Sequence, residues 1–169
     1  MSVTMTAGEQ ALAIEAIKRV FAARLRALDE KRWDIYPTLH TDDVVSETWA
    51  GLPADKQPRT GGTSNRVVGR EALTAAIRGM LGNSTYVTTV HHGHTPEIVL
   101  TADTTATGIW AMEDELWWND GETEQHLHGY GHYHEEYRKV GDEWLISYRK
   151  LTRLRETHTP RFFDYMAAL

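Results

Sequence analysis

The sequence contains no cysteine, which excludes disulfide bonds and thiolate metal sites. It also has no apolar run approaching the roughly 20 residues that a membrane-spanning helix needs. Its 18 Lys and Arg residues are outnumbered by 24 Asp and Glu residues, whereas a nucleic-acid surface requires a basic patch. The first residues, MSVTMTAGEQ, lack the basic and then apolar pattern of a signal peptide. We therefore expect a cytoplasmic protein that binds neither membrane nor nucleic acid.

The length and composition of the chain are typical of one globular domain. The chain has 169 residues, of which 41% are hydrophobic, and we expect residues 1–169 to form a single domain. Thr6 and Glu9 have the spacing of a capping box, and apolar side chains then recur every three or four residues as far as Leu28. This pattern predicts a long N-terminal helix. Further helices are predicted over residues 33–39 and 70–81.

The apolar spacing changes to two from residue 86 onward, which is typical of strands. It predicts four long strands, over residues 86–101, 104–118, 126–138 and 143–154, and a shorter strand precedes them at 44–49. The stretch 51–65, rich in Gly and Pro, is predicted to be a loop that serves as a lid. Helices followed by antiparallel strands indicate an α+β fold. We expect a cone-shaped, curved antiparallel sheet wrapped around the N-terminal helix and enclosing a pocket.

Two carboxylates are predicted on apolar surfaces. Asp29 follows the helical stripe on the side of Leu25 and Leu28, so it should face inward. Asp114 shares one face of its strand with tryptophan and methionine side chains. A carboxylate in such surroundings is protonated, paired or functional. The alternative to a functional Asp114 is a structural aspartate that binds the backbone or an arginine.

The histidines form a second pattern. His91 and His92 should point to opposite faces of their strand, with a bulge at the glycine that follows. Four more histidines share one strand parity, which would allow chelation of a metal: His126, His128, His132 and His134. The cupin metal motif does not fit, because Glu135 and Gly141 fall at the wrong offsets. We therefore predict no metal ligand among the four.

Three segments carry a resemblance to a known family: EAIKRVFAARLRALDEKRWD (15–34), HHGHTPEIVLTADTTATGIWAMEDELWW (91–118) and YRKVGDEWLISYRKLTRLRE (137–156). The chain resembles the SnoaL-like branch of the nuclear-transport-factor-2-like superfamily, which includes scytalone dehydratase and a hexachlorocyclohexane dehydrochlorinase. Within this branch it is most similar to bacterial bile-acid 7α-dehydratases. The resemblance implies a homotrimer, and the aromatic tail at 159–165 would be a natural interface element.

The resemblance also implies roles for individual residues. Asp29 and His91 match the catalytic aspartate and histidine of the family, Asp114 matches an acidic site residue, and Arg153 matches an arginine near the site. Arg24 departs from the pattern, because the family has a tyrosine there. A fixed cation replaces a neutral donor, so we expect Arg24 either to polarise a substrate carbonyl or to pair with Asp114.

Together these residues predict a cofactor-independent hydro-lyase that removes water from a hydroxylated 3-oxo-Δ4 steroid or bile acid, free or as its coenzyme A ester. In this prediction Asp29 supports His91 as the acid and base, and a neutral Asp114 donates to an enolate oxygen. The pocket for the flat, apolar, polycyclic substrate is walled by Trp110, Met112 and Trp118. The alternatives are a small-molecule binding protein without catalysis and a polyketide cyclase or isomerase with the same pocket.

Overall fold

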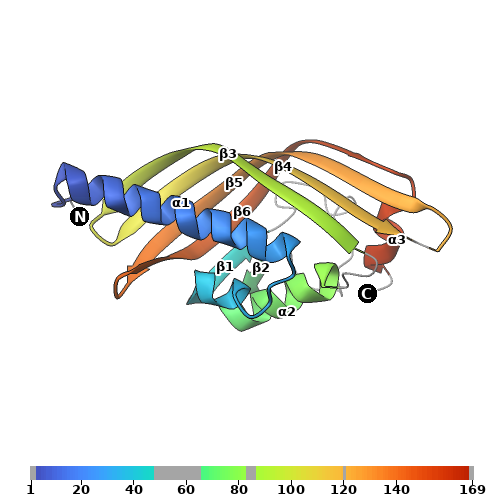
Figure 1. Cartoon of the computed structure of the whole chain (residues 1–169), viewed down its shortest axis with the longest axis horizontal. Coiled ribbons are helices and arrows are strands. Elements are labelled where there is room, and N and C mark those ends of the chain that lie inside the picture. Colours follow the sequence, from blue (N-terminus) through green and yellow to red (C-terminus); the bar gives the residue numbers. More distant parts are fainter. Residues whose placement is uncertain (1–2, 48–65, 83–86, 120, 168–169) are drawn as a thin grey trace.

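The computed structural model describes residues 3–47, 66–82, 87–119 and 121–167, and the side chains up to residue 164. The predicted lid at 51–65 lies outside these residues. Four long strands arch over α1 and α2, and α3 lies beneath the end of the sheet that is away from the N-terminus (Figure 1). The sheet has six strands in the order β2-β1-β6-β5-β4-β3 and is not closed into a barrel. The curved sheet and long N-terminal helix confirm the predicted α+β fold.

The helices begin and end where local chemistry predicts. Helix α1 (Ala7–Asp29) is capped by Thr6, whose side chain accepts from the Glu9 amide while the Glu9 side chain accepts from the Thr6 amide. Helix α2 (Arg70–Leu81) ends at Gly82, as predicted. The predicted helix at 33–39 is a 3-10 turn, η1 (Tyr36–Leu39), and the aromatic tail forms the short α3 (Phe162–Ala167). No helix in the described ranges is both long and apolar enough to cross a bilayer.

The long strands follow the period-two pattern closely. They are β3 (Val87–Ala102), β4 (Thr105–Asn119), β5 (Glu124–Val140) and β6 (Glu143–His158). The short strands are β1 (His40–Glu47) and β2 (Arg66–Val68). The four long strands pair antiparallel, as predicted, whereas β1 pairs with β6 in parallel, for example Ser46 with Arg149. Periodicity reveals that a segment is a strand, but not which strand it joins or in which direction.

Alternation along β4 separates the two faces of the sheet. Trp110, Met112 and Asp114 are buried under α1, whereas Glu113 and Glu115 lie half-exposed on the outer face. The register pairs His91 with Asp114 and His92 with Glu113, so His91 shares the inner face and His92 the outer one. The predicted opposite orientation of the two histidines is therefore confirmed, and the register shift that follows Gly93 confirms the bulge.

Candidate active site

The end of α1 and strand β3 bring Asp29 and His91 into contact. The His91 Nδ1 lies 2.6 Å from Asp29 Oδ1, and the His91 backbone amide donates to Asp29 Oδ2 at 2.9 Å. Two contacts to one carboxylate fix the imidazole ring in one orientation. The His91 side chain is 8% exposed and that of Asp29 is 25% exposed. Because the ring donates from Nδ1 to an ionised carboxylate, we assign Nε2 as the basic nitrogen.

Asp29 is held in its ionised form by a chain of donors. Thr89 donates to Asp29 Oδ1 at 2.8 Å, and Lys31 Nζ donates to the Thr89 hydroxyl at 3.0 Å. Burial acts to raise the pKa of Asp29, but the hydrogen bonds from His91 and Thr89 outweigh it and lower the pKa. An ionised Asp29 stabilises an imidazolium on His91, which is what a general base requires of its partner.

An open groove of about 440 Å³ runs beside this pair between α1 and β3. Its wall contains apolar, basic and acidic groups: Lys18, Phe21, Ala22, Leu25, Arg26, Asp29, Glu30, His91, His92, Gly93 and Trp110. Phe21 stacks on Trp110 with ring centroids 3.6 Å apart. A β-carbon at Gly93 would collide with the Phe21 ring, so glycine is what allows α1 to lie this close to β3. The volume is within the range of small-molecule sites.

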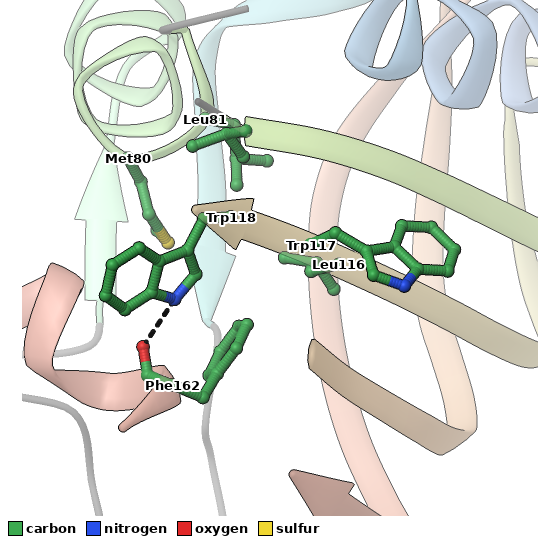
Figure 2. Close-up of a pocket in the computed structure, with 7 residues that line it drawn as sticks. Met80, Leu81, Leu116, Trp117, Trp118 and Phe162 are labelled. Carbon is green, nitrogen blue, oxygen red and sulfur yellow. Dashed lines mark hydrogen bonds between the residues drawn. The ribbon is translucent and has the colours of Figure 1, made fainter. Parts of the chain in front are cut away.

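The structure does not bring Trp110, Met112 and Trp118, the predicted wall of the pocket, to one site. Trp110 lines the groove, but Met112 is buried in the core cluster behind Phe21, Leu25 and Trp110 and does not itself line the groove. Trp118 lies at the far end of β4 and donates from Nε1 to the Phe162 carbonyl at 2.8 Å, beside a cavity of about 20 Å³ (Figure 2). Eight residues of strand separate Trp110 from Trp118, or about 26 Å. Alternation predicted their shared face correctly but does not bring them to one site.

Asp114 forms a buried ion pair instead of serving as a neutral donor. Arg153 binds both of its oxygens at 2.7 Å, and the two side chains are 4% and 7% exposed. Burial acts to lower the pKa of Arg153, but the hydrogen bonds with Asp114 outweigh it and raise the pKa. A β-carbon at Gly129 would collide with the Arg153 guanidinium, so that glycine makes room for the pair. The predicted role of Asp114 as a proton donor was therefore wrong, and the alternative of an arginine-bound aspartate is what the structure shows.

Arg24 also has a partner that the sequence analysis did not assign. Its guanidinium is fully buried and lies 2.8 Å from Glu135 Oε1, so the predicted pairing with Asp114 was wrong. Tyr137 donates to the other oxygen of Glu135 at 2.6 Å, and Trp110 Nε1 donates to the Tyr137 hydroxyl at 2.9 Å. This chain joins the core of α1 to the groove wall at Trp110. With no exposed surface, Arg24 does not line the groove, and its predicted contact with a substrate carbonyl is not available in this conformation.

A family model for the SnoaL-like domain matches residues 9–150, which is most of the chain. The chain belongs to the SnoaL-like domain family. The match contains α1 from Glu9 onward, both residues of the Asp29–His91 pair, and the long strands as far as the middle of β6. The resemblance of the three sequence segments is thus supported at the level of the family.

Solved structures share the fold of this SnoaL-like domain at low sequence identity. A protein from Novosphingobium aromaticivorans DSM 12444 assigned as a scytalone dehydratase has a TM-score of 0.72 and 18% identity, over 90% of this chain and 91% of that chain. A hexachlorocyclohexane dehydrochlorinase from Novosphingobium barchaimii LL02 has a TM-score of 0.69 and 14% identity, over 92% of this chain and 95% of that chain. ActVI-ORFA from Streptomyces coelicolor has a TM-score of 0.64 and 14% identity, over 84% of this chain and 97% of that chain. Identities this low support the fold alone.

Three residues around the site of this SnoaL-like domain were missed from the sequence. Thr89 and Lys31 complete the donor chain to Asp29, and Glu135 neutralises Arg24. Glu135 had a readable signal, because it shares strand parity with the buried Tyr133 and Tyr137. Thr89 likewise shares parity with His91. Nothing in the spacing points to Lys31, which reaches Thr89 only because its backbone turns to a positive φ of 58° after the helix.

Proposed function

We propose that this protein is a cofactor-independent lyase that eliminates water from a hydroxylated 3-oxo-Δ4 steroid or bile acid, free or as its coenzyme A ester. The proposal depends on one observation, the 2.6 Å contact between His91 Nδ1 and Asp29 Oδ1 in the wall of a groove. The dehydratase and dehydrochlorinase among the related folds carry names of elimination enzymes, which supports this reaction class.

The reaction begins with proton abstraction by His91. In a 7-hydroxy-3-oxo-Δ4 steroid the conjugated carbonyl acidifies the proton on C6, next to the hydroxyl-bearing carbon. His91 Nε2 takes this proton, the electron pair moves into the conjugated system, and a dienolate forms. The imidazolium, stabilised by Asp29, then gives its proton to the C7 hydroxyl, which leaves as water. The product is the 4,6-dien-3-one, and the histidine returns to its starting form.

The groove supports an apolar, flat substrate with an oxygen that becomes negative. Phe21, Leu25 and Trp110 provide the apolar surface on which such a ring system would lie. Since Arg24 and Asp114 are occupied by buried partners, the positive charge for the dienolate oxygen comes from the groove wall. Arg26 and Lys18 both line it, and Lys18 would exchange its exposed ion pair with Glu15 for the substrate oxygen. Lys18 and Arg26 thus take the role that the sequence predicted for Arg24 and Asp114, the stabilisation of the substrate oxygen.

Absorbance tests the proposal directly, because the dienone absorbs at longer wavelength than the enone. The purified protein, without added cofactor, should convert a 7-hydroxy-3-oxo-Δ4 bile acid or its coenzyme A ester to the 4,6-dien-3-one. The saturated 3-hydroxy analogue lacks the acidifying carbonyl and should bind without reacting. Turnover of the saturated analogue at a similar rate would contradict the enolate mechanism. Binding of both compounds with turnover of neither would favour a non-catalytic binding protein, and shifted double bonds or ring closure would favour an isomerase or a cyclase.

A further inference from the structure

The outer face of the sheet carries a cluster of carboxylates and imidazoles that the proposed reaction does not use. Glu113 and Glu115 project from β4, and His126 and His128 project from the neighbouring β5. In the register His128 lies opposite Glu115 and His126 lies opposite Trp117. Each imidazole reaches diagonally across the strands, His128 to Glu113 and His126 to Glu115. The two diagonal contacts therefore bring two imidazole nitrogens next to two carboxylates on the outer face.

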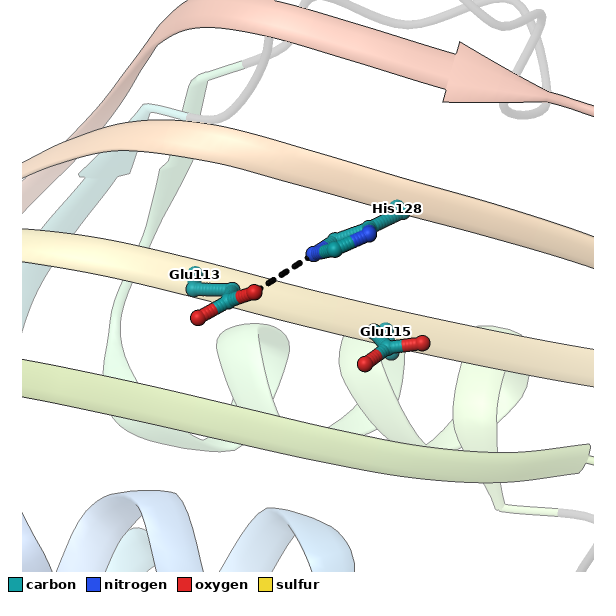
Figure 3. Close-up of side chains that lie close together, drawn as sticks. All are labelled: Glu113, Glu115 and His128. Carbon is teal, nitrogen blue, oxygen red and sulfur yellow. Dashed lines mark hydrogen bonds and ion pairs between the residues drawn. The ribbon is translucent and has the colours of Figure 1, made fainter.

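The donor atoms are close enough to share one ion. Single ligand atoms of Glu113, Glu115 and His128 all lie within 4.8 Å of one another (Figure 3). A metal bound at about 2.0–2.2 Å from each ligand holds its ligand atoms about 3–4 Å apart, so small side-chain rotations are enough. The three side chains are only 23–31% exposed, so their neighbours already restrict their movement. Figure 3 shows them on the side of the sheet away from α2.

A second imidazole stands next to this group. His126 Nε2 lies 3.0 Å from Glu115 Oε2, and the His126 ring stacks on Trp117 with centroids 5.0 Å apart and planes 13° apart. The stacking holds the ring with its Nε2 towards the carboxylate. The His126 and His128 ring centroids lie 6.1 Å apart, so a short movement of the His126 ring towards His128 would add a fourth ligand.

We propose that Glu113, Glu115 and His128, with His126 as fourth ligand, bind one divalent transition-metal ion of the zinc, nickel or cobalt class. Mixed imidazole and carboxylate donors suit these ions, whereas calcium and magnesium prefer oxygen ligands alone and copper(I) prefers sulfur. The prediction that His126 and His128 are not ligands is revised, and it stands for His132 and His134.

This metal site is distinct from the Asp29–His91 pair. Asp114, between Glu113 and Glu115 in the chain, points to the inner face, where it shares the register of His91. The sheet itself therefore separates the two sites. Loss of the metal should leave the proposed elimination unchanged, so a chelator that removes the ion should not abolish turnover.

Metal binding must replace an existing contact. In the metal-free protein His128 Nε2 lies 2.6 Å from Glu113 Oε1, and the ion takes the place of this hydrogen bond. A single site built on this contact binds one ion per chain, whereas adsorption of metal to scattered surface histidines has no fixed stoichiometry.

Isothermal titration of the untagged full-length chain with zinc chloride and with nickel chloride tests the proposal. One ion should bind per chain. His128→Gln and Glu115→Gln should each weaken binding at least about 10-fold. His134→Gln is the matched control, because His134 lies on the same strand and face but contacts Thr152, and it should bind normally.

Three results would overturn the proposal: no binding to millimolar metal, unchanged affinity in both His128→Gln and Glu115→Gln, or equal loss in His134→Gln. Unfolding temperatures without metal show whether each variant is folded, and Glu115→Gln keeps the shape of the native side chain. An unaltered metal affinity in Asp29→Asn, together with turnover that survives chelation, separates this proposal from the proposed lyase activity.

Discussion

At Asp29 a single carboxylate accepts three hydrogen bonds, from the His91 ring, the His91 amide and the Thr89 hydroxyl. This arrangement uses both oxygens and leaves the carboxylate little freedom to rotate. The orientation of the imidazole, and thus the direction in which Nε2 can take a proton, follows from a group at the end of a helix. A rigid helix end is a better support for such a ring than a loop would be.

Removing either member of this pair should remove turnover without unfolding the protein. Asp29→Asn keeps the shape but not the charge that supports an imidazolium, and His91→Ala removes the base. Each should lower kcat at least about 10²-fold, and the double variant should be little worse, because the two residues act as one unit. Steady-state rates of dienone formation measure the effect.

His134→Ala serves as the control for these variants, because that histidine lies on the outer face and contacts Thr152. It should retain its turnover. Near-normal activity in His91→Ala would refute the pair as the acid and base.

Glu135→Gln should cost far more stability than a surface change. It leaves the fully buried guanidinium of Arg24 without its counter-charge, a loss of about 3 kcal/mol or more in the free energy of unfolding. Glu136→Gln, one residue further and exposed on the other face, is the matched control and should change stability by less than about 0.5 kcal/mol. Urea unfolding compares the two, and equal midpoints would show that the buried pair contributes no stability.

His40 should make the protein sensitive to mild acid. Burial lowers the pKa of His40 from 6.5 to about 3, despite a hydrogen bond from its Nδ1 to the Tyr36 carbonyl. The unfolded chain therefore takes up a proton below pH 6.5 that the folded chain refuses, and stability falls as the pH drops from 6.5 towards 3. The loss should be about 1 kcal/mol for each pH unit.

Urea unfolding of the native protein and of His40→Asn at pH 7.5, 6.0 and 5.0 checks this expectation. The variant cannot titrate at this position, so its stability should change less over that range. Parallel curves for the two proteins would assign the acid sensitivity to other groups.

Individual residues were predictable only where alternation or helical spacing was enough. Helical spacing placed Asp29 at the inner side of α1, and alternation placed His91 and His92 on opposite faces of their strand. The choice of His91 as the partner of Asp29 came from the family resemblance, and the two side chains do meet. These patterns could not identify Glu135 as the partner of Arg24 or Arg153 as the partner of Asp114. Those pairings depend on strand register, and register shifts at bulges such as that between Tyr130 and Gly131 change it.

Among the elements, the long strands were predicted to within a few residues, because a half-buried sheet enforces a period of two. The three residues of β2 are too few to show any period, and α3 has too few turns to show an apolar stripe. The parallel pairing of β1 with β6 has no local signal at all. This pairing depends on how segments about a hundred residues apart pack together in the whole fold.

Helix α3 is attached to the sheet by Trp118, whose indole donates to the Phe162 carbonyl. Trp118→Phe removes this donor and should lower the free energy of unfolding by about 1–2 kcal/mol, since a buried carbonyl loses its partner. Turnover should stay unchanged, because Trp118 lies far along β4 from the groove. A loss of kcat in a folded Trp118→Phe variant would restore this residue to the substrate site.

For the whole molecule, the resemblance to the family still predicts a trimer. The predicted contribution of the aromatic tail is altered, however, because Phe162 packs into the core of its own chain beside Trp118 and Leu81. Sedimentation velocity at micromolar concentration should show a species of three chains. A monomer under those conditions would contradict the prediction.

The parallel contact between β1 and β6 has a consequence for biosynthesis. β1 leaves the ribosome about a hundred residues before its neighbour Tyr148–Lys150, so the nascent chain carries an unpaired strand edge through most of its translation. Until β6 emerges, β1 lacks the strand that joins it to the long strands of the sheet. Yield in cells should therefore depend on chaperones, and a premature stop before residue 143 should produce an aggregating fragment instead of a smaller folded protein.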